Sequence, residues 1–283
     1  MDCRIHLAQV EPTLGNVERN LALHVESVGA ARAAGADVVL FPELSLTGYF
    51  LKDQTAEVAL AREAAPVRAL VERSREISIG FGFVERARDG RIFNSYAFLE
   101  RGELLHVHRK VHLVGYGMFE ESRDLAPGER FVAFDSAHGR LGVLICEDAW
   151  HAAGAWLYFL AGVDALIVPS CSPARGVAAG ERGLASERTW TTLLEATAIR
   201  CQAWVVYVDR VGCEDGIAFA GGSRVIDPGG RELARLQGMD PGGLDVALEP
   251  HALERARLQT PLRRDEKPWI VLRELQRLEE EER

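Results

Sequence analysis

The way in which short apolar segments follow one another restricts the fold of this chain. Residues 5–10 and 37–41 are predicted to form buried strands, and residues 16–34 between them carry apolar side chains at helical spacing. A helix that joins two such strands indicates a parallel strand pair in an α/β protein.

A different connection follows. Residues 78–84, 92–100 and 104–108 are predicted strands joined by tight turns, so they are expected to pair antiparallel. Parallel and antiparallel pairs together require mixed sheets and argue against a purely doubly wound sheet. Further helices are predicted at 55–74, 152–161, 183–202 and 269–278, and further strands at 131–136, 142–145, 165–169, 204–208, 218–226, 233–236 and 244–248.

So many apolar strands are best buried by two sheets packed face to face with helices outside them. The 283 residues show no low-complexity linker and no break in composition. We therefore predict one α/β domain over residues 1–283.

The composition argues against several classes of protein. A net charge of -9 does not suit a nucleic-acid partner, because proteins that bind nucleic acids present a basic face. No apolar run approaches the roughly 20 residues of a membrane span, and the N-terminus does not resemble a secretory signal. We expect a cytoplasmic protein that binds neither nucleic acid nor membrane.

The cysteines and histidines do not predict a disulfide framework or a metal site. The five cysteines are odd in number and scattered, and no Cys or His spacing typical of a metal site occurs. No cofactor or metal is therefore expected. His106, His108 and His112 alternate near a predicted strand, and we interpret them as solvated or edge-strand histidines.

One cysteine occupies a position that suits a nucleophile. Predicted strand 142–145 leads directly into Cys146, and a helix is predicted shortly after it. The helix dipole and free backbone N–H groups at such a junction favour a thiolate. A buried apolar filler is the alternative, since most free cysteines have that role.

Two other polar residues also follow predicted strands. Glu43 comes after residues 37–41, and Lys110 comes after residues 104–108. A thiol, a carboxylate base and an ammonium group are sufficient for acyl transfer, with the backbone N–H of Glu147 as a further donor to the oxyanion. No GxSxG elbow is present, and among the histidines His151 is the best candidate for a Cys–His pair.

Each of these three residues lies in a short motif. In chain order the motifs are Phe41-Pro-Glu-Leu-Ser-Leu-Thr-Gly-Tyr49, Arg109-Lys-Val-His-Leu113 and Leu144-Ile-Cys-Glu-Asp-Ala-Trp150. They resemble the signature blocks of the nitrilase superfamily of carbon–nitrogen hydrolases. The resemblance implies a four-layer α-β-β-α sandwich, usually dimerised, in which Glu43 is the base, Lys110 the cationic stabiliser and proton donor, and Cys146 the nucleophile. It also implies a second glutamate, for which Glu121 aligns better than Glu120.

A narrower likeness rests on the same blocks together with Phe219-Ala-Gly-Gly-Ser223. These are similar to the glutaminase domain of glutamine-dependent NAD synthetases. The resemblance implies that Tyr49 and Tyr116 line an amide pocket and that Ser172 contacts the amino-acid end of the substrate. The sequence departs from the family after Tyr49 and after Ser172-Pro, which puts glutamine itself in doubt as the substrate.

The C-terminal part of the chain bears on whether this domain stands alone or precedes a second domain. Pro261-Leu-Arg-Arg-Asp265 is similar to the linker that follows the glutaminase domain, yet no synthetase half or ATP-binding loop follows it here. We therefore predict a free-standing domain. Residues 257–283 are predicted to form an extension that packs at the interface of a homodimer or larger homo-oligomer.

Three functions stay open from the sequence. The leading hypothesis is hydrolysis of a small linear amide through a thioester on Cys146, with release of ammonia. The second is hydrolysis of an N-carbamoyl amino acid, whose carboxylate Arg175 would bind through paired hydrogen bonds. A nitrile is a less favoured substrate. The third is a glutaminase-like subunit that works only in a larger complex.

Overall fold

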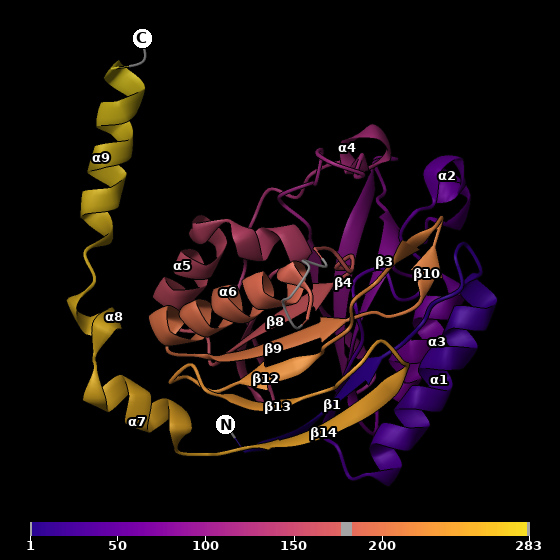
Figure 1. Cartoon of the computed structure of the whole chain (residues 1–283), viewed down its shortest axis with the longest axis horizontal. Helices are drawn as coiled ribbons and strands as arrows, with labels where there is room; N and C mark the ends of the chain where they lie inside the picture. Colours follow the sequence, from indigo (N-terminus) through magenta and orange to yellow (C-terminus); the bar gives the residue numbers. More distant parts are fainter. Residues whose placement is uncertain (1, 177–182, 282–283) are drawn as a thin grey trace.

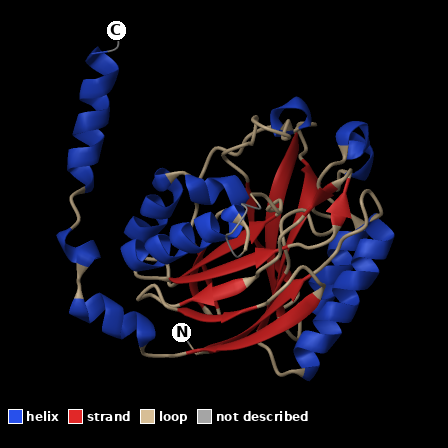
Figure 2. Cartoon of the chain, viewed as in Figure 1, coloured by secondary structure: helices blue, strands red, loops and turns tan. Residues whose placement is uncertain are grey.

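The computed structural model describes residues 2–176 and 183–281, and within them two six-stranded sheets lie face to face. Figure 1 and Figure 2 show helices on the outer faces of the two sheets. The predicted α-β-β-α sandwich with mixed sheets is therefore confirmed.

The first sheet combines both kinds of strand pairing predicted from the sequence. Its β1, β2 and β3 pair parallel, whereas β14 joins β1, and β4 and β5 follow β3, in antiparallel pairing. In spatial order the strands are β14 (Gly242–Leu248), β1 (Cys3–Gln9), β2 (Val38–Leu40), β3 (Ser78–Arg86), β4 (Ile92–Glu100) and β5 (Glu103–Arg109).

The second sheet repeats this plan. A parallel centre, β7 to β9, is flanked by antiparallel strands on both sides. In spatial order the strands are β13 (Glu232–Arg235), β12 (Arg224–Ile226), β9 (Trp204–Asp209), β8 (Ala165–Ser170), β7 (Gly139–Val143) and β6 (Phe134–Ser136), and a separate hairpin pairs β10 (Cys213–Glu214) with β11 (Ile217–Ala218).

Three apolar clusters correspond to the three boundaries between the layers. One unites side chains of both sheets, such as Leu7 and Val206. A second packs the first sheet against α1 (Val17–Ala33) and α3 (Ala65–Arg73). A third packs the second sheet against α5 (Ala152–Ala161) and α6 (Ala185–Cys201). Because β2, β8 and β9 are buried along their whole length, they are nearly continuous apolar runs in the sequence.

The helix predicted over residues 55–74 is wrong as a single element. The structure has η1 (Lys52–Gln54), α2 (Thr55–Val58) and then a break before α3. In the break Leu60 forms a bridge to Glu85 of β3, and Pro66 lies in the first turn of α3. Proline is tolerated at a helix start but removes a hydrogen bond from a helix interior, which explains the interruption.

The strand predicted over residues 142–145 begins and ends earlier in the structure, as β7 (Gly139–Val143). β7 ends at Val143, and the short helix η2 (Cys146–Trp150) begins after two further residues.

The remaining helices are α4 (Glu121–Asp124), α7 (Ala252–Gln259), α8 (Leu262–Asp265) and α9 (Pro268–Glu281). Among the described residues, no helix has both the length and the apolar character that a membrane span requires.

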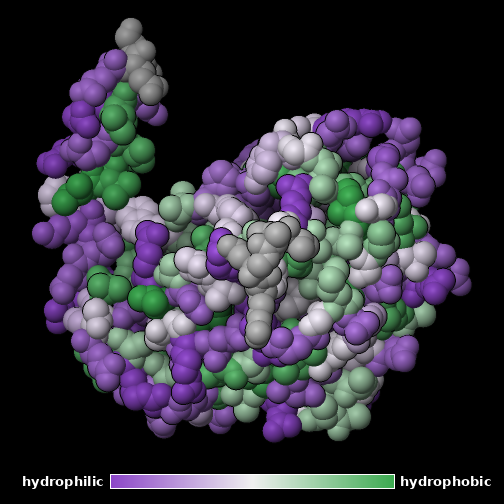
Figure 3. Space-filling view, in the orientation of Figure 1, coloured by the Kyte–Doolittle hydropathy of each residue, from purple (hydrophilic) through white to green (hydrophobic). Residues whose placement is uncertain are grey.

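Helix α9 projects away from the sandwich (Figure 1). Its apolar side chains stay exposed, including Trp269 at 57%, and Val271, Leu275 and Leu278 recur at helical spacing. Figure 3 shows hydrophobic side chains gathered along this arm. An exposed apolar stripe of this kind is typical of a surface that contacts another protein.

The predicted packing of the C-terminal extension at an oligomer interface therefore stays a prediction with a direct test. Deletion of residues 266–283 is expected to shift the protein to a smaller oligomer, because it removes the apolar stripe of α9. Light scattering coupled to gel filtration measures the molar mass. An unchanged mass in the truncated protein would contradict the prediction.

Candidate active site

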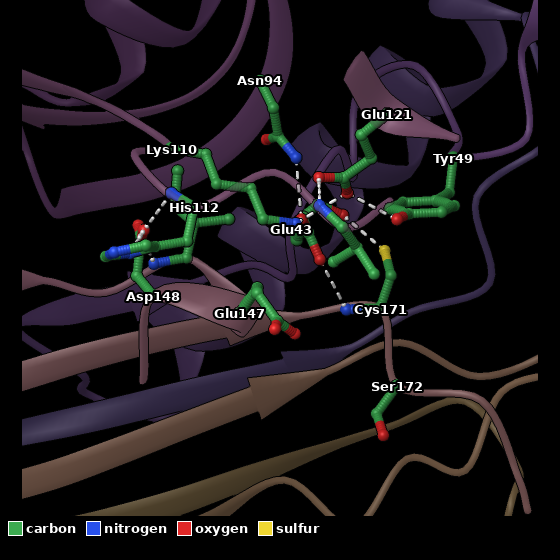
Figure 4. A network of polar contacts seen from close by, with 12 residues as sticks. Glu43, Tyr49, Asn94, Lys110, His112, Glu121, Glu147, Asp148, Cys171 and Ser172 are labelled. Carbon is green, nitrogen blue, oxygen red and sulfur yellow. Dashed lines mark hydrogen bonds and ion pairs between the residues drawn. The ribbon is translucent and has the colours of Figure 1, made fainter. Parts of the chain in front are cut away.

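A buried lysine lies between two carboxylates at the centre of the site (Figure 4). Lys110 follows β5, and its Nζ lies 2.8 Å from Glu43 Oε1 and 2.6 Å from Glu121 Oε1. Its residue exposure is only 1%. Burial lowers the pKa of Lys110, but attraction to Glu121 and Glu43 outweighs it and raises the pKa well above its ordinary value. The ammonium is therefore charged at neutral pH.

Glu43 is held by groups from both sheets. Asn94 of β4 donates to Oε1 at 2.7 Å, and the backbone N–H of Cys171, which follows β8, donates to Oε2 at 2.9 Å. Burial raises the pKa of Glu43 despite the opposing attraction of Lys110. A carboxylate with a raised pKa, fixed in orientation, is suited to accept a proton.

Cys146 begins η2 and has a backbone φ of 45°, a left-handed conformation that is uncommon for residues other than glycine. The side chain is partly exposed. Burial, followed by repulsion from Glu43, raises the pKa of the Cys146 thiol well above its ordinary value, although Lys110 opposes this shift. This direction runs against the expectation that the strand–helix junction favours a thiolate, because burial disfavours the charged form.

Glu121, rather than Glu120, faces the lysine. Its Oε1 also accepts a hydrogen bond from Tyr49 Oη at 2.5 Å, and its Oε2 accepts one from the backbone N–H of Val114 at 2.9 Å. Glu120 is exposed. The structure thus brings Glu43, Lys110, Glu121 and Tyr49 into one network.

The other residues predicted to contact substrate lie around this network with partners of their own. Tyr116 Oη donates to the Glu147 carboxylate, with 3.1 Å to each oxygen. Ser172 is buried, and its hydroxyl accepts a hydrogen bond from Trp190 Nε1 at 2.8 Å. The Arg175 guanidinium lies 5.3 Å from the centre of the Phe119 ring. Their contacts with substrate stay predictions.

Sequence reasoning missed several residues of the site. Cys171 directly follows the apolar strand β8, so the strand-end pattern used for Glu43 also pointed to it. Asn94 lies inside β4 and gave no such signal. His108 lies on the edge strand β5, in line with the edge-strand interpretation, but it is buried rather than solvated, and its Nε2 lies 3.0 Å from Asp148 Oδ2.

Asp209, at the end of β9, is a further buried carboxyl. Its Oδ1 accepts from the backbone N–H groups of Ser172 and Arg210, and its Oδ2 accepts from Tyr207 Oη. Burial raises the pKa of Asp209 from 3.8 to about 8, despite these hydrogen bonds. The neutral form is thus favoured in the folded protein.

This pKa predicts how stability depends on pH. A folded-state pKa above the unfolded value stabilises the protein below pH 4, and this stabilisation is lost as the pH rises toward 8 at up to about 1.4 kcal/mol per pH unit. Asp209→Asn, which mimics the neutral acid, is expected to reduce this loss. Urea unfolding of both proteins at pH 5 and pH 8 measures it. Equal pH dependence in the two proteins would contradict the prediction.

The chain is similar in sequence to known proteins. The sequence profile of the carbon–nitrogen hydrolase family matches residues 4–257. A glutamine-dependent NAD(+) synthetase of Acinetobacter baylyi is 31% identical over 227 residues, which cover 80% of this chain and 40% of that protein. The chain thus spans about two fifths of the length of that curated relative.

Two solved structures are similar to this chain in fold. A glutamine-dependent NAD+ synthetase of Acinetobacter baumannii superposes with a TM-score of 0.79 and 26% identity over 89% of this chain and 47% of that one. An amidase of Nesterenkonia sp. AN1 superposes with a TM-score of 0.76 and 26% identity over 91% of this chain and 97% of that one, and acrylamide has added to its active-site cysteine.

Proposed function

The chain belongs to the carbon–nitrogen hydrolase family, and on that premise we propose that it hydrolyses a small linear carboxamide through a thioester on Cys146. The observation that carries this proposal is the buried Lys110 ammonium between Glu43 and Glu121, close to a partly exposed thiol.

In the first half of the reaction, Glu43 accepts the thiol proton as Cys146 Sγ attacks the amide carbon. The raised pKa of the thiol means that it is protonated at rest, so the attack requires a base, and the raised pKa of Glu43 suits that role. Lys110 and the backbone N–H of Glu147 stabilise the negative oxygen of the tetrahedral intermediate. The C–N bond then breaks, the proton passes to the leaving nitrogen, and ammonia departs.

In the second half, water replaces the sulfur. Glu43 removes a proton from the water as its oxygen attacks the thioester carbon. The C–S bond breaks, the thiolate regains its proton, and the product leaves as a carboxylic acid. Glu121 holds Lys110 in place through both halves by accepting a hydrogen bond from Nζ, and Tyr49 orients Glu121 by donating its hydroxyl hydrogen bond to the same carboxylate.

A glutamine-like ω-amide is the substrate class that we favour. Glu147 offers a buried carboxylate one residue from Cys146, and Arg175 offers a cation that lies over the Phe119 ring. A carboxylate and a cation of this kind match the ammonium and carboxylate of an amino acid. The names of the relatives, glutamine-dependent synthetases, support the same class.

A second candidate is a glutaminase-like subunit of a larger complex. It is favoured by one finding, namely that the synthetase relatives are longer than this chain, which spans about 40% of the A. baylyi protein. Such a subunit would use the same chemistry but would release ammonia at a useful rate only with its partner bound.

Ammonia release from the purified chain tests these proposals. Glutamine, butyramide, N-carbamoyl-β-alanine and propionitrile are compared, with carbon dioxide measured for the carbamoyl compound. We expect turnover of ω-amides and a mass increase on Cys146 that equals the acyl group. Carbon dioxide release would favour the carbamoyl alternative. No ammonia from any compound, together with no adduct on Cys146, would overturn the proposed function.

A further inference from the structure

Asp148 has a fully buried carboxylate that accepts five hydrogen bonds. Three reach Oδ1, from the backbone N–H groups of Val111 and His112 and from His112 Nδ1, at 2.9–3.1 Å. Two reach Oδ2, from His108 Nε2 at 3.0 Å and from the backbone N–H of Ile145 at 3.2 Å. All the donors are N–H groups, so the carboxylate is the common acceptor of this cluster.

The donors come from two segments that carry reacting groups. Val111 directly follows Lys110, at the end of β5 in the first sheet. Ile145 directly precedes Cys146, just after β7 in the second sheet. Asp148 therefore connects the lysine-bearing segment of one sheet to the cysteine-bearing turn of the other. Figure 4 shows Asp148 beside His112 and next to Glu147.

We propose that Asp148 is a positioning residue that sets the relative placement of Lys110 and Cys146. This inference rests on the proposed function, because the placement is needed for acyl transfer. Asp148 does not touch the reacting atoms. It acts through the two backbone segments that it ties together, and through His108 and His112, which must each present an N–H to it.

Asp148 connects the two segments as a charged hydrogen-bond acceptor rather than through packing of its side chain alone. Burial raises the pKa of Asp148, but hydrogen bonds from His108 and His112 outweigh it, and the pKa falls well below its ordinary value. The carboxylate is thus ionised and can only accept, which specifies the Nε2–H tautomer of His108 and the Nδ1–H of His112. Cys146 has a left-handed backbone conformation, which is costly for a residue other than glycine and persists only where the surrounding structure holds it.

A matched pair of variants at His108 tests the proposal. His108→Gln supplies an amide N–H where Nε2–H stood, whereas His108→Leu fills a similar space without a donor. Asp148→Asn is the direct change, since its amide N–H₂ would face other N–H donors. The kcat and KM for the best amide, the thermal midpoint, and the rate of Cys146 alkylation by iodoacetamide are measured for each. Peptide mass spectrometry reports alkylation at Cys146 relative to the exposed Cys213 in the same sample.

Small displacements of reacting groups cost about 100-fold in rate, so Asp148→Asn is expected to lower kcat about 100-fold while KM changes less than about threefold. For the same reason His108→Leu is expected to lose about tenfold in kcat, and His108→Gln to stay within about threefold of wild type. Alkylation at Cys146 relative to Cys213 is expected to fall in Asp148→Asn and His108→Leu only.

The proposal would be overturned if His108→Leu and His108→Gln have equal kcat and equal alkylation ratios, whatever their thermal midpoints. A purely structural role would lower the midpoint without separating the two. If Asp148→Asn does not fold, the His108 pair still decides. If wild type hydrolyses none of the amides, the proposed function fails, while the alkylation ratios still test whether Asp148 positions Cys146.

Discussion

Replacement of Cys146 by alanine is expected to reduce ammonia release by at least about 10⁴-fold in kcat/KM, because it removes the thiol that forms the proposed acyl intermediate. The remaining groups, Lys110 and the two glutamates, would bind an amide but have no nucleophile to deliver. Ammonia is measured with the amide that the screen identifies, at concentrations below KM. Measurable turnover near the wild-type rate would contradict the assignment of Cys146 as nucleophile.

The control for this experiment is Cys213→Ala. Cys213 lies exposed in β10, outside the network around Lys110, so its replacement is expected to leave kcat/KM unchanged. Cys146 is partly exposed, and the thermal midpoint of Cys146→Ala is expected to stay close to that of wild type. A protein that is folded but inactive separates loss of chemistry from loss of structure.

The raised pKa of the Cys146 thiol determines how this nucleophile must be activated. A preformed thiolate, which the strand–helix junction would favour, could react without a base. Burial and the nearby Glu43 instead keep the thiol protonated, so the base and the nucleophile must act together. The sequence pointed to both groups but could not reveal their protonation states, since burial and charge spacing arise only when the two sheets pack.

The fold was largely predictable because its strands are short, apolar and separated by strong turn signals. The parallel pair β1–β2 and the antiparallel strands β3 to β5 agree with the predicted connections. The error over residues 55–74 has a physical origin. An Ala-, Glu- and Arg-rich segment has high helix propensity, but Leu60 is drawn into a bridge with Glu85, and this tertiary contact overrides propensity.

Reasoning from the residues alone pointed to the candidate site only where a polar residue follows an apolar strand, whereas Glu121 and Tyr49 came from the family resemblance. Glu43, Lys110 and Cys146 have that pattern, and the structure brings Glu43 and Lys110 into direct contact. Asn94 and Asp148 form hydrogen bonds with residues that are remote from them in sequence. Their partners, Glu43 and His108, lie 51 and 40 residues away, so only the packed structure reveals them.

Replacement of Lys110 by methionine has the second large expected effect, and it acts on both activity and stability. Methionine has a similar length but no charge, so Glu43 and Glu121 would face one another in a buried site without the cation that lies within 2.8 Å of each. Breaking a buried ion pair on one side costs roughly 3–5 kcal/mol of unfolding free energy. Loss of a charged oxyanion donor is expected to lower kcat by about 10²–10³-fold or more.

The pH dependence of this destabilisation distinguishes charge repulsion from lost packing. In wild type, the pKa of Lys110 is raised, so its stabilisation is present throughout the range below pH 10. In Lys110→Met, one carboxyl can take up a proton at pH 5 but must be ionised at a cost at pH 8. The deficit in unfolding free energy is therefore expected to be larger at pH 8 than at pH 5, as measured by urea unfolding.

A double variant separates stability from catalysis. Lys110→Met combined with Glu121→Gln removes one of the two facing charges, so it is expected to recover much of the stability lost at pH 8. It does not restore a cation beside Glu43, and kcat is expected to stay as low as in Lys110→Met alone. If the double variant recovers activity together with stability, Lys110 serves the fold rather than the reaction. If it recovers neither, repulsion between the two glutamates is not the cause of the instability.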